Sequence, residues 1–280
     1  MDTTSYKKFN FASMCKNPHI CIIGKRSSGK TYIVLDILSY LYETKKIDEC
    51  VIISPTNKYT HQYDCITQNT FYEYNEKNIV ELMNKQKERL AKKISTTVAL
   101  VFDDCLPSKN DWIKSSLMNE LFLNSRYYNI VFIFTMQFPL GISPDIRSNF
   151  DYIFLLEDDF ISNVKRYYDH YAGSFPSFES FRDTFSELTK NYGALVITQQ
   201  TNILDKIFFY RASEIKSKIN IPMTYLENDE PTKGINNLLT SIASCNEKIC
   251  NYIMSNDLNE NKLKIFQSIV DNNNLILSKF

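Results

Sequence analysis

The stretch from His19 to Thr31 constrains this chain more than any other. It begins with the short apolar run His19–Ile23, whose β-branched residues are typical of a buried strand. It continues as Gly24-Lys25-Arg26-Ser27-Ser28-Gly29-Lys30-Thr31, which fits the pattern G-x-x-x-x-G-K-[ST]. Apolar residues then recur at the spacing of one helix face, at Ile33, Val34, Ile37, Leu38 and Leu41. A strand, a glycine-containing loop and a helix in this order predict a phosphate-binding loop.

The residue types in this loop suit the binding of phosphate. Gly24 and Gly29 permit backbone angles and close approach that a Cβ would prevent. Successive backbone N–H groups can then point inward and form an anion site at a helix N-terminus. We expect Lys30 to bind the β- and γ-phosphates and the Thr31 hydroxyl to bind Mg²⁺. The sequence therefore predicts a site for a nucleoside triphosphate, formed by residues 24–31.

Composition sets limits on the rest of the chain. With 280 residues, 44% of them hydrophobic, the chain is long enough for a large core in one or two domains. The 32 basic and 32 acidic residues cancel, so any surface that binds nucleic acid must be local. Seven cysteines without a C-x-x-C motif favour reduced thiols in an intracellular compartment over disulfides or a zinc site. We find no signal peptide and no apolar run of about 18 residues, and expect no membrane span.

A second motif follows a long helical stretch. The apolar run from Val98 to Phe102 ends at two carboxylates, Asp103 and Asp104, as in a Walker B strand. A buried strand would hold these carboxylates rigidly at the edge of the sheet where ligands bind. We expect Asp103 to hold Mg²⁺, directly or through water, and Asp104 to act as a general base toward the attacking water. An acidic turn after a strand also occurs without function, but its place behind a phosphate loop favours the catalytic interpretation.

Two further polar residues flank the next predicted strand, Ile130–Thr135. Arg126 ends a predicted helix that contains Trp112, Ile113, Leu117, Leu121 and Phe122, and Gln137 follows the strand. Considered alone, Arg126 is a cation at a helix end and Gln137 is a polar strand terminus. Because this strand follows the Walker B strand by one helix, a γ-phosphate sensor role for Gln137 is favoured.

The remaining segments have less specific patterns. We predict further strands at 51–53, 152–156, 194–198 and 207–210, the last two as an antiparallel pair, and a helix that opens at Glu157-Asp158-Asp159 and runs to Ala172. Residues 1–18 either form an edge strand or cover the adenine. The most basic helix contains Lys85, Lys87, Arg89, Lys92 and Lys93; a solvated face is its default interpretation and a DNA-binding face the alternative. The polar, Asn-rich chain after Pro222 suggests two domains, an ATPase domain at 1–216 and a helical appendage at 217–280.

The order of these motifs resembles the DNA-packaging ATPases of nucleocytoplasmic large DNA viruses and their smaller relatives such as virophages, the poxvirus-like branch of the FtsK–HerA superfamily. The resemblance covers about residues 15–215. It is carried by residues 24–31, Val101–Asp104, Ser125–Ile130, Thr135–Gln137 and Asp145–Asn149. It implies an α/β, RecA-like P-loop NTPase fold: a mostly parallel central sheet flanked by helices, antiparallel edge strands and a small helical C-terminal tail. The strand that ends at Gln137 would lie between the phosphate-loop strand and the Walker B strand.

The resemblance also implies a function. The chain would be an ATPase that uses ATP and Mg²⁺, forms a homo-oligomeric, hexameric ring and moves double-stranded DNA into a capsid, with capsid or portal proteins as further partners. For a viral protein, the expected location is the host cytoplasm or virus factory, and the virion. Arg126 would be the arginine finger that reaches a neighbouring subunit's γ-phosphate, with Arg147 as the second candidate for finger or sensor. Two positions depart from the pattern: Asp104 stands where many members have Glu, and Tyr127 where relatives often have His.

Two other functions fit a phosphate loop. A small-molecule kinase needs a substrate pocket and a lid, and the sequence contains no Arg-rich lid, while the pair Asp103-Asp104 suits the activation of water. A nucleotide-gated assembly factor without enzymatic activity could keep Lys30 and Thr31. It would have no use for Asp104, Gln137 and Arg126 together.

Overall fold

The computed structural model describes residues 6–67, 70–105, 115–139, 142–199, 205–213, 219–222 and 224, and scattered positions between 242 and 273. Two compact units are present, residues 1–224 and residues 225–280. The described positions of the second unit, Ile242 and Ile269 among them, are helical. Other apolar residues of the helical appendage predicted for 217–280, at 238–239, 263 and 265–266, lie outside the described residues. The predicted domain boundary after residue 216 stays a prediction.

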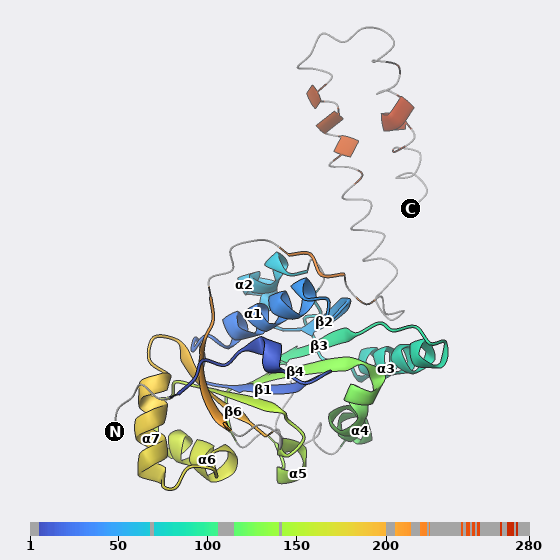
Figure 1. The fold of residues 1–280 in the computed structure, drawn as a ribbon. Coiled ribbons are helices and arrows are strands. Elements are labelled where there is room, and N and C mark those ends of the chain that lie inside the picture. The colour runs from blue at the N-terminus through green and yellow to red at the C-terminus, as the bar shows by residue number, and fades with distance from the viewer. Residues whose placement is uncertain are drawn as a thin grey trace. The chain divides into compact units, whose positions relative to one another are not determined.

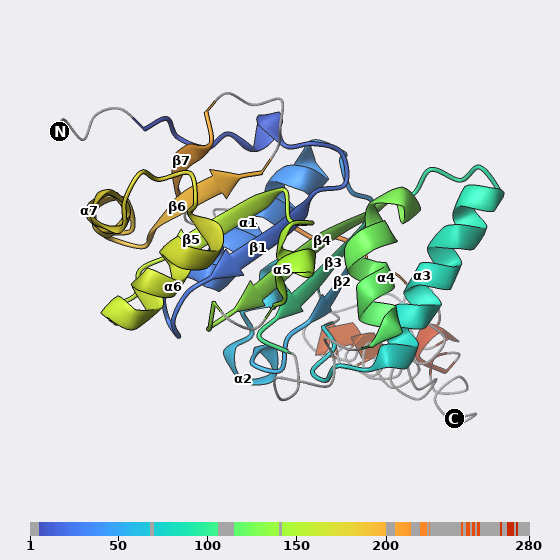
Figure 2. The same cartoon turned by 90° about the horizontal axis from the view of Figure 1, so that it is seen from below.

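The first unit is built on one seven-stranded sheet (Figures 1 and 2). Its strands are β1 (His19–Ile23), β2 (Glu49–Ile53), β3 (Val98–Asp103), β4 (Ile130–Met136), β5 (Tyr152–Leu156), β6 (Gly193–Thr198) and β7 (Ile207–Arg211). Their order is β2-β3-β4-β1-β5-β6-β7. The strands from β2 to β5 are mutually parallel, whereas β6 and β7 are each antiparallel to their neighbours. The predicted fold class is confirmed, and β4 lies between β1 and β3 as the resemblance implied.

Helices cover both faces of this sheet (Figures 1 and 2). One face carries α1 (Lys30–Glu43), and the other carries α4 (Ser116–Asn124), α5 (Pro144–Arg147) and α6 (Ile161–Tyr171), with α3 (Glu76–Ala91) beside α4 and α7 (Phe178–Leu188) beside α6. The short helix α2 (Asn57–Thr60) follows β2. Because both faces are covered, every residue of the four strands β1, β3, β4 and β5 is buried, and these strands read as continuous apolar runs rather than as alternating ones.

The core is contributed by both layers. On the α1 face, Ile37 and Leu38 are fully buried in one cluster with Ile22 and Val101 of the sheet. On the other face, the ring of Phe122 in α4 lies 5.1 Å from the ring of Phe132 in β4, in an edge-to-face arrangement. The sheet is therefore held rigid at its centre, and the residues at the ends of β1, β3 and β4 are placed accurately.

The structure corrects one predicted helix start and decides between the two alternatives for the N-terminal residues. The predicted helix start at Glu157 is wrong, because α6 begins at Ile161. Asp158 is buried, and its carboxylate accepts hydrogen bonds from the N–H of Phe160, the Asn163 amide and the Tyr167 hydroxyl. Residues 7–9 run beside β7, where Lys8 pairs with Phe209, which favours the edge-strand alternative.

The predicted helix before β4 is divided. Its described part, α4, begins at Ser116, and the positions 112 and 113 lie outside the described residues. A 3₁₀-helix, η4 (Ser125–Tyr128), follows α4 and carries Arg126. Among the described residues no helix is both long and apolar enough to cross a membrane, and the six cysteines there form no disulfide with one another.

Candidate active site

The loop between β1 and α1 has the backbone geometry of an anion site. Gly29 has a φ of +100°, in the region that favours glycine, and α1 begins directly after it. A Cβ on Gly24 would lie 2.5 Å from Ser28 Oγ and 2.8 Å from Leu156 Cβ, so that position accepts glycine alone without rearrangement. The Ser28 hydroxyl is buried and has no hydrogen-bond partner in the described structure. A buried polar atom without a partner is costly, and phosphate oxygens at this helix N-terminus would satisfy it.

The side-chain amino group of Lys30 lies at the centre of this loop. Its side chain is buried, and Nζ donates to the carbonyl oxygens of Gly24 at 2.9 Å and Lys25 at 3.2 Å. The same Nζ lies 3.3 Å from Oδ2 of Asp104. Lys30 therefore joins the phosphate loop to the end of the Walker B strand, where the γ-phosphate of a bound nucleotide is expected.

Asp103 is the last residue of β3 and is 3% exposed. Its Oδ1 accepts a hydrogen bond from Thr135 Oγ1 at 2.7 Å, and its Oδ2 accepts one from Ser54 Oγ at 3.2 Å. Burial raises the pKa of Asp103, and the hydrogen bond from Thr135 opposes this shift. A buried carboxylate whose ionised form is disfavoured fits a site for a divalent cation, which would stabilise that form.

Asp104 follows in a left-handed backbone conformation, with a φ of +46°. Its N–H donates to Thr135 Oγ1 at 3.0 Å, which fixes the turn. Its carboxylate is partly exposed, and Oδ2 accepts a hydrogen bond from Gln137 Nε2 at 3.2 Å. The structure thus brings Lys30, Asp104 and Gln137 together, and Asp104 keeps the access to solvent that a general base acting on water needs.

The sequence interpretation assigned no role to Thr135 and Ser54, whose hydroxyls donate hydrogen bonds to Asp103 in the structure. Thr135 pairs in register with Asp103 across β3 and β4, and its hydroxyl contacts both aspartates. Ser54 directly follows β2, the neighbour of β3 on its other side. One signal in the sequence could have found them: each of the two strands beside the Walker B strand has a small hydroxyl residue at its carboxyl end. Because parallel strands end at the same edge of a sheet, such residues are expected to lie near the Walker B aspartates.

A magnesium ion fits this site only together with a nucleotide. The described residues contain no group of three or more His, Cys, Asp or Glu side chains that could hold a metal ion. Mg²⁺ commonly uses one or two protein oxygens and completes its octahedron with phosphate oxygens and waters. Thr31, half-buried at the start of α1, and Asp103 are the residues that would hold it.

The remaining loop residues face outward. Lys25 forms an ion pair with Asp159, a contact that raises the pKa of Lys25, so its side chain is directed toward the segment after β5. Arg26 and Ser27 are exposed, and Ser27 has a φ of +62°. Their part in the site is the backbone, whose N–H groups are available to phosphate.

Arg126 lies at the other end of the parallel strands from the phosphate loop, where these strands begin. It precedes β4, and its guanidinium donates to the carbonyl oxygen of Asn149 at 3.1 Å and lies 3.4 Å from Oδ1 of Asp151. Asp151 Oδ2 in turn accepts from the N–H of His19, the first residue of β1. The five residues of β1 span roughly 16 Å at about 3.3 Å each, so Arg126 is remote from the phosphate loop of its own chain.

Arg147 is not brought into the phosphate loop either. It ends α5, and its guanidinium carbon lies 5.5 Å from the centre of the Tyr171 ring in α6. For Arg126 and Arg147 alike, a role in the site of a neighbouring subunit stays a prediction.

Comparison with known proteins gives close viral relatives. No protein-family model matches the chain. The uncharacterized protein L437 of Acanthamoeba polyphaga mimivirus is 36% identical over 223 residues, which are 75% of this chain and 78% of L437. The uncharacterized protein 075L of Invertebrate iridescent virus 6 is 30% identical over 185 residues, which are 64% of this chain and 69% of 075L. The chain belongs to the family of these viral proteins.

This L437 family has the fold of a P-loop NTPase. The genome packaging NTPase B204 from Sulfolobus turreted icosahedral virus 2, in its complex with AMP, is similar with a TM-score of 0.53 and 13% identity over 72% of this chain and 100% of B204. In its complex with sulfate the TM-score is 0.55, with 15% identity over 71% of this chain and 98% of B204. At these identities the likeness shows the shared fold, and the chemistry must be argued from the residues described above.

Proposed function

We propose that this chain is an ATP-hydrolysing motor that moves double-stranded DNA into a viral capsid. The observation that carries the proposal is the convergence of Lys30, Asp104 and Gln137 beside the loop formed by residues 24–31. A site that only bound nucleotide would need the loop and Lys30. The additional carboxylate and amide are the groups needed to activate and orient a water molecule.

The proposed reaction is the hydrolysis of the γ-phosphoryl group. Water attacks the γ-phosphorus, its proton passes to an Asp104 carboxylate oxygen, and the bond to the β–γ bridging oxygen breaks to leave ADP and phosphate. Gln137, held against Asp104 at 3.2 Å, orients that water, and Lys30 neutralises charge on the β- and γ-phosphates. Mg²⁺ held by Thr31 and Asp103 would supply further charge neutralisation.

The same contacts favour hydrolysis over the two alternatives. In a kinase the base must face a bound acceptor molecule, whereas Oδ2 of Asp104 here is contacted by both Gln137 Nε2 and Lys30 Nζ, at 3.2 and 3.3 Å, which suits a base that acts on water beside the γ-phosphate. In an assembly factor without enzymatic activity, the pairing of Gln137 with Asp104 would have no purpose. We therefore retain the enzymatic interpretation.

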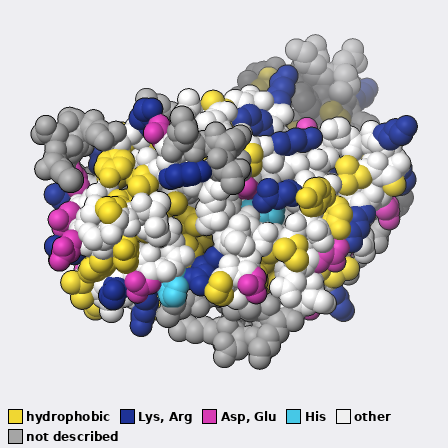
Figure 3. All heavy atoms as spheres, turned by 60° about the horizontal axis from the view of Figure 1, so that its bottom comes forward, with side chains coloured by type: hydrophobic (Ala, Val, Ile, Leu, Met, Phe, Trp, Pro, Cys, Tyr) yellow, Lys and Arg dark blue, Asp and Glu magenta, His cyan; other side chains and the backbone are white. Residues whose placement is uncertain are grey.

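The DNA-directed part of the proposal is supported by the viral relatives and by the shared fold with an NTPase whose name includes genome packaging. The basic helix α3 does not support it. Two of its cations form ion pairs within the chain, Lys87 with Glu120 and Arg89 with Glu49, and Lys92, which follows the last residue of α3, pairs with Glu88. Figure 3 likewise shows lysine and arginine side chains scattered over the face that it presents, with acidic ones among them. The solvated-face interpretation of α3 is therefore favoured.

A ring of identical subunits would complete the site. The side chain of Arg126 is 31% exposed and lies at the edge of the sheet remote from its own phosphate loop. In a ring, this edge of one subunit can face the nucleotide of the next, and an arginine supplied in this way neutralises charge in the transition state. We place such a ring, with its capsid or portal partners, in the host cytoplasm or virus factory and in the virion.

The decisive experiment measures ATP hydrolysis with and without duplex DNA, with the molecular mass determined on the same sample. We expect an oligomer whose hydrolysis depends on Mg²⁺ and rises with DNA. If phosphates are the DNA contacts, DNA affinity will fall steeply as salt increases. Hydrolysis that DNA does not change, or an affinity for DNA that is independent of salt, would argue against DNA as the track, while a monomer that hydrolyses at full rate would argue against the ring.

A further inference from the structure

Tyr192 is an exposed aromatic residue held in an unusual turn. It lies between α7 and β6, its side chain is 68% exposed, and its φ is +61°, a conformation that bulky residues rarely adopt. The preceding Asn191 is also left-handed, and the next N–H, of Gly193, donates to the carbonyl oxygen of Lys190 at 3.1 Å. A Cβ on Gly193 would lie 2.1 Å from the carbonyl oxygen of Leu188. The turn is therefore compact, and its geometry holds the Tyr192 ring toward solvent.

This ring lies beside the phosphate loop. Cδ1 and Cβ of Tyr192 are 3.5 and 3.7 Å from the position that a Cβ on Gly29 would occupy, and Cδ2 of Leu156 is 3.8 Å from the same point. Gly29 is the residue immediately before α1. Tyr192 therefore stands next to the N-terminus of the helix that would bind the phosphates, on the side of β5 and β6.

The direction of a bound triphosphate can be worked out from the sheet order. β1 lies between β4 and β5. Lys30, Asp104 and Gln137, which would act at the γ-phosphate, gather on the β4 and β3 side. The α-phosphate and its nucleoside must then leave the loop on the other side, toward β5 and β6, where Tyr192 and Leu156 stand.

We propose that the Tyr192 ring stacks on the base of the bound nucleotide, which makes this turn the nucleobase site. The proposal rests on the nucleotide binding proposed above and adds the recognition of the base. An exposed ring can offer its face to a flat heterocycle, and the larger surface of a purine gains more from stacking than a pyrimidine does. The residue thereby favours ATP over UTP and over inorganic triphosphate.

The test uses two variants of the full-length chain. Tyr192→Asn removes the ring and keeps a residue that tolerates the left-handed backbone, whereas Tyr192→Phe keeps the ring. Binding of Mg·ATP, Mg·UTP and Mg·tripolyphosphate is measured by calorimetry. We expect Tyr192→Asn to weaken ATP by about tenfold, within the roughly 5- to 150-fold range of base–aromatic stacking, to leave tripolyphosphate within twofold, and to reduce the preference for ATP over UTP. Tyr192→Phe retains all three affinities.

Two further variants separate the possible failures. Tyr59→Asn removes an 80% exposed tyrosine from α2, next to the strand at the far end of the sheet, and should change none of the affinities. Lys30→Ala should weaken ATP and tripolyphosphate alike. If it does and Tyr192→Asn binds ATP as the wild type does, the stacking proposal is overturned and the nucleotide site stands. If Lys30→Ala changes neither affinity, the proposed nucleotide site itself is wrong. Equal losses of ATP and tripolyphosphate in Tyr192→Asn would show a structural role for the ring and would also overturn stacking.

Discussion

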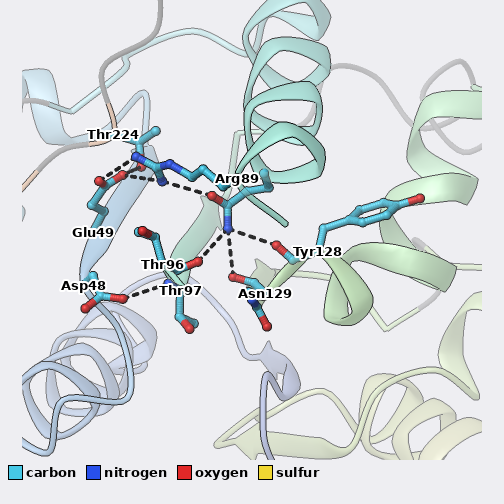
Figure 4. A network of polar contacts seen from close by, with 9 residues as sticks. Asp48, Glu49, Arg89, Thr96, Thr97, Tyr128, Asn129 and Thr224 are labelled. Atoms are coloured by element: carbon cyan, nitrogen blue, oxygen red, sulfur yellow. Dashed lines mark hydrogen bonds and ion pairs between the residues drawn. The ribbon is translucent and has the colours of Figure 1, made fainter. Parts of the chain in front are cut away.

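The two ends of the parallel strands use their polar residues differently. We call the end where these strands begin the amino edge and the end where they finish the carboxyl edge. At the amino edge, polar groups connect neighbouring strands and helices to each other. Gln86 donates to the carbonyl oxygens of Thr96, Tyr128 and Asn129, and Arg89 forms a two-pronged ion pair with Glu49 (Figure 4). At the carboxyl edge, the buried Ser28 hydroxyl has no partner in the described structure and burial disfavours the charge on Asp103. These contacts at the amino edge stabilise the fold, whereas we propose that the carboxyl edge binds a ligand.

Arg126 tests this division, because it lies at the amino edge and is assigned a catalytic role. As a finger it would contribute a factor of 10³–10⁵ to turnover, which is roughly 4–7 kcal/mol of transition-state stabilisation. Its ion pair with Asp151, whose side chain is only 8% exposed, also gives Arg126 a structural role, since its loss leaves a buried carboxylate with one partner fewer. We expect Arg126→Ala to lower the DNA-stimulated kcat by that factor while the protein stays folded at the assay temperature, with thermal unfolding measured in parallel.

A mixing experiment shows whether Arg126 acts between subunits. Arg126→Ala subunits retain Lys30, and Lys30→Ala subunits retain Arg126. In a mixed ring some interfaces combine both intact residues, so hydrolysis should reappear when the two inactive proteins are mixed. A mixture as inactive as its components, with mixed oligomers demonstrated, would contradict a finger that acts in trans.

Gln137 is expected to have the next largest effect. As a hydrogen-bond donor held at the reacting group, Gln137 should contribute a factor of about 10²–10³ to kcat, and its loss should change the ATP affinity little. Gln137→Ala removes that donor from Asp104. Single-turnover hydrolysis separates the chemical step from binding and product release. A change in ATP affinity with the chemical step intact would assign Gln137 to binding.

His19 provides a measurement at the amino edge. Burial, and secondarily the nearby Arg126, lower its pKa from 6.5 to about 4, so the folded protein resists a proton that the unfolded chain accepts. The contribution of neutral His19 to the free energy of unfolding is therefore fully present above pH 6.5. It is lost as the pH falls toward 4, and the loss amounts to about 3 kcal/mol. Urea unfolding of wild type and His19→Gln across this range should show the difference, because the variant lacks this titration. Parallel pH profiles of the two proteins would refute the assignment.

Gln86 should have the smallest effect of the set. Gln86→Ala leaves three main-chain carbonyl oxygens without their shared donor, and we expect a loss of about 1–3 kcal/mol of unfolding free energy. Gln86→Met, which keeps the volume, is the matched control for packing. Nucleotide affinity should stay the same in both variants, and a selective loss of ATP binding would mean that the two edges are not independent.

The sequence predicted the buried strands and the motif residues at their carboxyl ends, and it missed contacts at both edges. The boundaries of β1 and β5 and the position of Asp103 follow from contiguous apolar runs, which are local signals. The contact of Arg126 with Asp151 joins residues brought together by the sheet order, which no local pattern encodes. The start of α6 was misplaced because Asp158 is satisfied by three later groups rather than by the helix that it was expected to open.

The carboxyl edge as a hydrolytic site is tested most directly by Asp104→Asn. Asparagine has the same shape as aspartate and tolerates the left-handed conformation at this position, so folding should be preserved. Our account predicts that Mg·ATP binds within a few-fold of wild type while hydrolysis falls by about 10²–10⁴, the usual contribution of a general base. Hydrolysis equal to that of the wild type, with nucleotide bound equally well, would contradict it.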